Sequence, residues 1–432
     1  MYAQTMRLLL LLAGFAALLP AEQDRMDLLE QVRARVLDSL RRLPKYMCTQ
    51  SIYRQQIEPP RREEHASCDD DVAPRKLRVT TSDRIRLDVG VTATGEIYSW
   101  AGASRFDDRS LFGLVREGAL STGSFASFLT SIFRDDQATF SYQGETTEGG
   151  RQLSEFGFRV SQEQSHYTYL GTGARVITAY EGEFRVDSKT ADLVRLVVRT
   201  SHLPPETGAC QATTSLDYGR VRLQGTDFLL PTATLLLIRD TNGVEMQNRT
   251  EFSNCHEFLG ESTVTFDPPP ESIQSPSAPA ESKALSLPAG LRFQVILAQS
   301  IDTATAAAGD AVAARLFTPI KDSSSKVLVR AGADVTARIV RIRQYFGPPV
   351  VVVLSLKLES VRVGGVSFPL SARPDDTVQP FILRPGSLHP RVEFSTLDVM
   401  TDRNAMSVEL RNVQPNRPTP YGLESAWLTT GH

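Results

Sequence analysis

The alternation of apolar and polar residues predicts one early helix followed by a long series of strands. Apolar residues recur every three or four positions between residues 29 and 43, which predicts a helix with a single apolar face. Asp24 is the expected N-cap, and Pro44 is expected to stop the helix because proline lacks the backbone N–H that a helix needs. The apolar face consists of Leu29, Val32, Val36, Leu40 and Leu43.

The residues that follow have a period of two, which is typical of strands with one buried face. Ile85, Leu87, Val89 and Val91 alternate with more polar neighbours. From residue 138 to 266 the chain reads as strand-sized segments joined by short turns. Short connections between consecutive strands predict an antiparallel meander, and a sheet of this length must curl.

A second zone of helical spacing lies between Asp107 and Asp135. We expect a helix that begins after a cap at Ser121 or Thr122 and covers the sheet. The pattern does not decide whether this helix covers a filled core or an apolar binding surface. The candidate ligand-binding residues are the aromatic members of the zone, Phe125, Phe128 and Phe133.

A Pro- and Ser-rich stretch from Asp267 to Pro288 separates two regions. Proline removes backbone donors and favours extended backbone, so we expect a linker here. Strands punctuated by glycine follow, and they predict a small all-β domain. The expected organisation is a signal peptide at 1–21, a large β domain at 24–266, the linker at 267–288, a small β domain at 289–372, and a tail at 373–432 with a candidate closing strand at 421–427.

The first 21 residues have the pattern of a secretory signal peptide. Arg7 leads directly into an uncharged apolar run over residues 8 to 21. This run is shorter than the roughly 20 residues that a membrane-spanning helix needs. We therefore expect export to the periplasm or the cell exterior, with no transmembrane segment in the mature chain.

Charge and cysteine content narrow the picture further. The net charge of −3 argues against a nucleic-acid partner. The four cysteines form no CxxC motif, and an even number in an exported chain predicts two disulfides, with three pairings open. These residues are Cys48, Cys68, Cys210 and Cys255.

Three segments resemble known exported proteins. The hairpin FRVDSKTADLVRLVVRT (184–200) resembles that of periplasmic lipoprotein carriers of the LolA/LolB type and their regulatory relatives. YMCTQSIYR (46–54) and NRTEFSNC (248–255) resemble segments of exported bacterial proteins of the same build. The resemblance covers residues 24–266 and implies an unclosed antiparallel β-barrel plugged by helices. Because the carriers hold lipid acyl chains in an apolar interior, it also implies a lipid or another hydrophobic ligand.

This layout implies a disulfide pairing. It places Cys48 in the first strand and Cys255 in a late strand, so a bridge between them would tie together the two ends of the domain. Cys68 would then pair with Cys210.

The C-terminal region carries a second resemblance. The order of strands separated by Ala308-Gly309-Asp310 and Ala331-Gly332-Ala333 resembles the outer-membrane scaffold domain of conjugative transfer systems. The resemblance implies a β-barrel-like interaction module.

Patterns that carry catalysis or hold cofactors are absent from the sequence. Ser323 and Lys326 match SxxK, but they lie between predicted strands and lack the SDN and KTG partners of acyl-serine enzymes. The six histidines have no metal-binding spacing. Acid pairs such as Asp135-Asp136 are expected at helix ends or in solvated turns. We expect no enzyme activity, no metal and no cofactor.

Together these patterns favour an exported, non-enzymatic envelope protein of mainly β, α+β class. Its concave half-barrel is expected to bind a lipid or another hydrophobic ligand. The alternative is a structural or assembly module that contacts envelope proteins through the C-terminal β domain.

Overall fold

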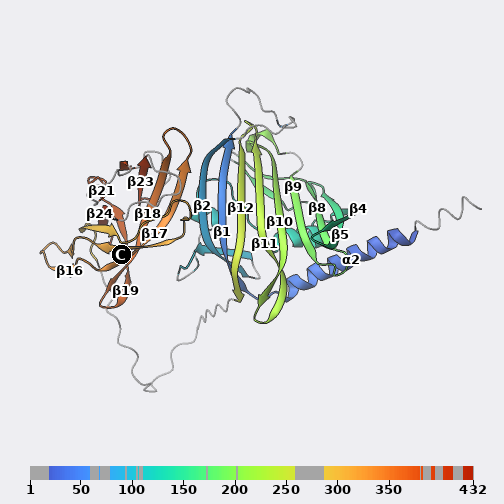
Figure 1. Cartoon of the computed structure of the whole chain (residues 1–432), viewed down its shortest axis with the longest axis horizontal. Coiled ribbons are helices and arrows are strands. Elements are labelled where there is room, and N and C mark those ends of the chain that lie inside the picture. The colour runs from blue at the N-terminus through green and yellow to red at the C-terminus, as the bar shows by residue number, and fades with distance from the viewer. Residues whose placement is uncertain are drawn as a thin grey trace, which may run out of the picture.

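The structure is a computed structural model, and antiparallel strands make up most of it (Figure 1). The predicted signal peptide lies outside the described residues up to residue 18, and so does the predicted linker up to residue 286. The described residues are 19–58, 68, 78–92, 95–103, 106, 110–171, 174–200, 203–257, 287–379, 381–382, 391–394, 402–411 and 422–431.

The N-terminal strands form one curled sheet that does not close, as predicted. Its two edges are β3 (Gly95–Trp100) and β4 (Thr139–Glu148), and these two described strands do not pair with each other. Every neighbouring pair in this half-barrel is antiparallel. From β4 to β3 the order is β5 (Arg151–Val160), β8 (Tyr180–Asp187), β9 (Leu193–Thr200), β10 (Ala209–Leu223), β11 (Thr226–Asp240), β12 (Glu245–Glu257), β1 (Tyr46–Glu58) and β2 (Arg78–Thr92).

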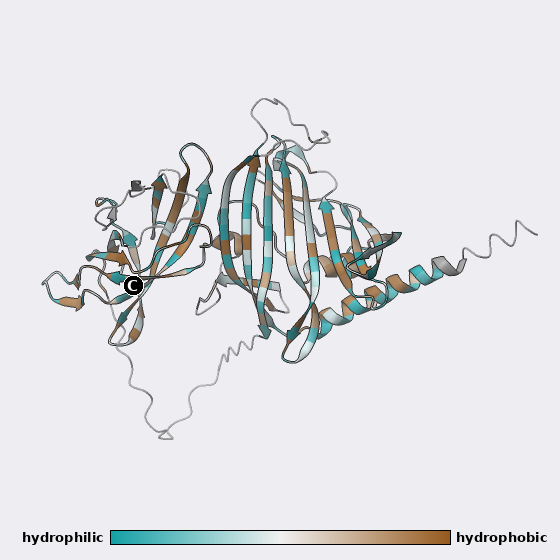
Figure 2. Ribbon diagram, in the orientation of Figure 1, coloured by the Kyte–Doolittle hydropathy of each residue, from teal (hydrophilic) through white to brown (hydrophobic). Residues whose placement is uncertain are grey.

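Side chains along the strands alternate between the two faces of the sheet, and hydropathy alternates with them (Figure 2). In β1, Tyr46, Cys48 and Ile52 are buried, and their neighbours are partly exposed. In β8 the same alternation buries Tyr180 and Phe184. The sheet therefore has one apolar face that requires a cover.

The long helix α2 (Leu19–Arg42) supplies much of that cover. Leu29, Val32 and Val36 of the predicted apolar face are buried against the half-barrel, in one cluster with Phe184. The helix begins ahead of the predicted cap and ends two residues before Pro44.

The second predicted helix is wrong in extent, because only short helical turns form within the described residues 110–135. The first α-helical turn after the predicted cap begins at residue 127 and has no side-chain cap. The carboxylate of Glu96 on β3 accepts hydrogen bonds from the N–H groups of Gly123 and Phe125, at 2.8 and 3.2 Å. Gly123 has a φ of +83°, which no α-helix allows, and Glu96 supplies acceptors for the amides of this stretch in place of the expected Ser or Thr cap. The turns are α3 (Leu111–Leu114), α4 (Ser127–Thr130) and the π-helical η1 (Ser131–Asp135).

Two small strand pairs and one 3₁₀ turn lie outside the main sheet. β6 (Thr168–Leu170) and β7 (Arg175–Ile177) pair only with each other among the described strands, and so do β15 (Ile320–Lys321) and β16 (Val327–Val329). A short 3₁₀ turn, η2 (Pro205–Thr207), precedes β10.

The C-terminal strands enclose a hydrophobic core of their own, which includes Phe293, Val335, Leu356 and Trp427. The last described strand, β24, pairs with β13 on one side and with β20 and β21 on the other. The strands are β13 (Arg292–Leu297), β14 (Ala311–Leu316), β17 (Asp334–Tyr345), β18 (Val351–Val363), β19 (Val366–Pro369), β20 (Ala372–Pro374), β21 (Phe381–Ile382), β22 (Arg391–Phe394), β23 (Ala405–Arg411) and β24 (Leu423–Thr429).

Two disulfides cross-link the N-terminal domain. Cys48 on β1 is bonded to Cys255 on β12, and Cys68 to Cys210 on β10. These are the pairs implied by the layout of the carriers. The first bridge joins residues 207 positions apart, so it fixes the two ends of the domain next to each other.

Replacing Cys48 and Cys255 with alanine is predicted to lower the free energy of unfolding by about 5 kcal/mol, because a loop of this length gains much entropy in the unfolded chain. Guanidinium titration of the wild type and the double variant under oxidising conditions measures the difference. An unchanged unfolding midpoint would contradict the prediction.

Candidate functional site

A cavity of about 460 Å³ lies between α2 and the half-barrel. Val36 and Leu40 of α2 form one side, and Leu193 at the start of β9 and Leu229 of β11 lie on another. These side chains line the cavity and are buried or half-buried, and we call them its inner wall. The complete apolar wall is Val36, Leu40, Phe125, Leu129, Ala191, Leu193, Phe228 and Leu229.

Charged side chains stand at the mouth of this cavity. Those of Arg35, Arg42 and Arg220 are 56, 68 and 51 % exposed. Arg220 Nη2 donates to Asp192 Oδ2 at 2.6 Å, and Arg35 pairs with the same carboxylate at 3.5 Å. Exposed ion pairs of this kind contribute little to the free energy of folding. Together with the apolar wall, these charged residues give the site an apolar interior and a polar, solvated entrance.

The three aromatic candidates occupy different environments. Phe125 is buried and lines the cavity. Phe133 is part of the core, with its ring 5.3 Å from that of Phe184. Phe128 is half-buried, with its ring 5.9 Å from that of Tyr167. The structure thus brings only Phe125 of the three to the cavity, and a ligand-binding role for any of them stays a prediction.

Sequence reasoning missed the wall residues of β11, because no local pattern shows which hairpin of a meander lies beneath α2. A signal was present in the run Phe228, Leu229, Leu230. A strand with one wet face alternates, so consecutive apolar residues indicate that both faces are covered.

A buried acid lies at the end of the helical cover. Asp136 follows η1 directly, so it stands at a helix end, one of the two expected places, but it has no exposed surface. Its carboxylate accepts hydrogen bonds from the backbone N–H of His166 at 3.1 Å and from the Tyr180 hydroxyl at 2.8 Å. The imidazole Nδ1 of His166 lies 2.5 Å from the other carboxylate oxygen. This cluster ties the end of the cover to β8 and to the segment before β6.

The cluster does not have the ligand set of a metal site. Among the residues that the structure describes, no group of three or more His, Cys, Asp or Glu side chains is placed to hold a metal ion. Within the same residues, no helix combines the length and the apolarity that a membrane crossing requires.

The stability of the protein is predicted to depend on the titration of His166. The hydrogen bond and the charge of Asp136 raise the pKa of His166 above 6.5. Its protonated form therefore stabilises the fold fully below about pH 6.5, and this contribution is lost as the pH rises through the pKa of the folded state. The difference in unfolding free energy between the wild type and His166→Ala should shrink from pH 5.5 to 8.5. His256→Ala serves as a control, because that ring contacts a backbone carbonyl. A difference that does not vary with pH would contradict the assignment.

Comparison with known proteins gives distant likenesses to solved structures. No family model matches the chain, and no curated protein matches it. A putative outer membrane lipoprotein-sorting protein domain from Vibrio parahaemolyticus is 8 % identical, with a TM-score of 0.27 over 54 % of this chain and 93 % of that chain. A DUF1329 family protein from Desulfovibrio piger is 10 % identical, with a TM-score of 0.26 over 54 and 92 %. A LolA superfamily protein from Nitrosomonas europaea is 10 % identical, with a TM-score of 0.23 over 53 and 94 %.

Proposed function

We propose that the half-barrel binds a lipid or another hydrophobic ligand in the cavity beneath α2, as a non-enzymatic carrier. The observation that carries this proposal is the cavity itself, whose volume of about 460 Å³ is in the range of small-molecule sites. Half of the residues that line it are apolar, and these would desolvate an acyl chain or a similar group.

The charged mouth supports an amphiphilic ligand rather than a plain hydrocarbon. Arg35, Arg42 and Arg220 keep their side chains exposed beside the apolar wall. In this arrangement an acyl chain would lie inside and a polar headgroup would stay at the entrance.

The disulfides support an exported carrier, since such bonds persist in oxidising compartments. We infer the periplasm or the cell exterior as the place of action. The assembly role of the C-terminal domain, and its resemblance to a conjugative scaffold, stay predictions.

Binding of a dansyl-labelled undecanoic acid, followed by fluorescence, tests the proposal. The wild type should bind the probe, and Leu40→Trp should weaken binding by about tenfold or more, because the larger ring takes the space of at least two methylene groups of the ligand.

Met26→Trp is the matched control, because Met26 lies on the same helix, is 52 % exposed and does not line the cavity. It should bind the probe like the wild type. A wild type that binds neither this probe nor co-purifying lipid would refute the carrier proposal.

A further inference from the structure

The C-terminal domain extends the half-barrel at one edge. On β2, β3 pairs with residues 87–92, and β17 pairs with residues 81–83 on the stretch that β3 leaves open. Ala308 adds a second contact, because its N–H donates to Arg84 O at 2.8 Å and its carbonyl accepts from Arg86 N–H at 2.7 Å. The two domains are therefore joined by backbone hydrogen bonds.

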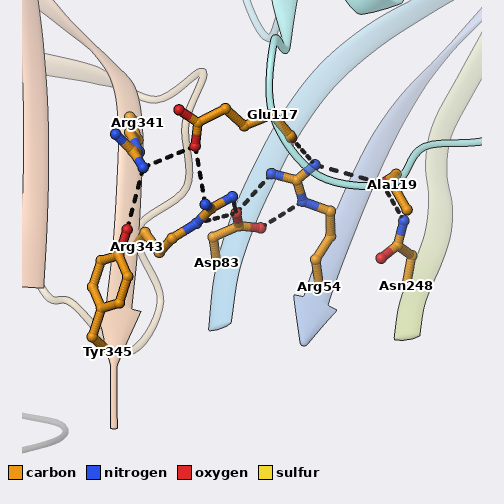
Figure 3. A network of polar contacts seen from close by, with 8 residues as sticks. All are labelled: Arg54, Asp83, Glu117, Ala119, Asn248, Arg341, Arg343 and Tyr345. Carbon is orange, nitrogen blue, oxygen red and sulfur yellow. Dashed lines mark hydrogen bonds and ion pairs between the residues drawn. The ribbon is translucent and has the colours of Figure 1, made fainter. Parts of the chain in front are cut away.

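A buried carboxylate at this seam is shared by both domains (Figure 3). Asp83 on β2 accepts hydrogen bonds from Arg54 Nε and Nη2, at 2.7 and 2.6 Å, and from Arg343 Nη2 of β17, at 2.9 Å. The side chains of Asp83 and Arg54 are only 8 and 9 % exposed. Burial by itself raises the pKa of Asp83. The two guanidinium groups lower this pKa by more than burial raises it, so the carboxyl group stays ionised.

Arg54 and Arg343, together with Arg341, also hold the connecting segment, which we define as residues 115–126 between α3 and α4. Arg54 Nη1 donates to the carbonyl of Glu117 at 2.6 Å. The Glu117 carboxylate accepts from Arg341 Nη2 at 2.9 Å and from Arg343 Nη1 at 3.0 Å (Figure 3). The segment is thus held from the half-barrel through its backbone and from the C-terminal domain through one side chain.

Local geometry shows how closely the segment fits against Arg54. Gly118 has a φ of +77°, and a Cβ at this position would lie 2.8 Å from Arg54 Nη1. Asn248 of β12 donates its side-chain amide to the carbonyl of Ala119. Polar contacts therefore fix the first half of the segment.

Apolar packing at the seam is less complete. A cavity of about 110 Å³ lies beside the network, lined in part by Trp100, Leu114 and Ile342. The far end of the connecting segment carries Phe125, and α4 follows with Leu129, both in the wall of the larger cavity. A movement of the segment would therefore change that wall.

We propose that the C-terminal domain controls access to the ligand cavity by holding the connecting segment through Glu117. Arg341 and Arg343 act as positioning residues: they keep the segment, and with it Phe125, in the position in which Phe125 lines the cavity. The ligand part of this inference rests on the proposed carrier function, whereas the coupling between the domain and the segment does not.

Hydrogen exchange of the full chain, read by mass spectrometry, tests the coupling without any ligand. Glu117→Gln should raise the exchange rate of amides in residues 115–126 by about tenfold, because it weakens two charge-assisted hydrogen bonds. Arg341→Gln removes one of these two bonds and should raise exchange less, and the double variant should exchange little faster than Glu117→Gln alone. Glu117→Asp retains the charge and should restore part of the protection.

Arg86→Gln is the matched control, because it breaks the ion pair of Arg86 with Asp310 across the same seam but does not touch the connecting segment. It should leave residues 115–126 unchanged. Equal exchange in Glu117→Gln and the wild type, or an equal rise in Arg86→Gln, would overturn the coupling.

Stopped-flow uptake of the dansyl probe then tests control of access. Glu117→Gln should speed uptake by about the same factor as it raises exchange, with a smaller change in Kd. Faster exchange with unchanged uptake would overturn control of access while leaving the coupling intact. A wild type that binds no probe would refute the carrier function, and the exchange data would still decide the coupling.

Discussion

The arrangement of the protein depends on one buried carboxylate, that of Asp83, at the point where the two domains meet. Removing one partner of a buried ion pair typically costs about 3–5 kcal/mol, since the remaining charge is left unpaired in a medium of low dielectric constant. Asp83 on β2 binds Arg54 of the same domain and Arg343 of the C-terminal domain, so separation of the domains would leave Arg343 without this partner, while Arg54 would keep it. Arg54 also holds the backbone of Glu117, which places the connecting segment in the same polar network.

Three further features give the unclosed barrel a defined form, because a sheet that does not close does not by itself fix what covers its concave face. The disulfide between Cys48 and Cys255 fixes the ends of the domain, and α2 packs its apolar face onto the sheet. The third feature is the buried Asp136, which anchors the end of the helical cover. Between these anchors the cavity beneath α2 stays partly unfilled, and the proposed carrier function depends on that space.

Local patterns predicted the elements whose formation depends on local physics. The spacing of Val32 and Val36 predicted the buried face of α2, and the alternation around Leu87 predicted β2, because both patterns follow from the geometry of one element. The helix expected directly after residues 121–122 did not form, because Gly123 adopts a positive φ and its amide is bound by Glu96 of another strand. The pairing of β17 with β2 joins residues about 260 positions apart, and no local periodicity reports such a contact. For the same reason the aromatic pattern pointed to Phe125, whereas no local pattern pointed to the β11 side of the cavity.

The most direct test of the account is hydrogen exchange of the full chain carrying Asp83→Asn. If the shared carboxylate joins the parts, amides in β2 at residues 81–83, in β17 at 343–345 and in the connecting segment will all exchange faster than in the wild type, while β8 and β9 retain their protection. Faster exchange confined to β2, with β17 and the connecting segment unchanged, would contradict the account.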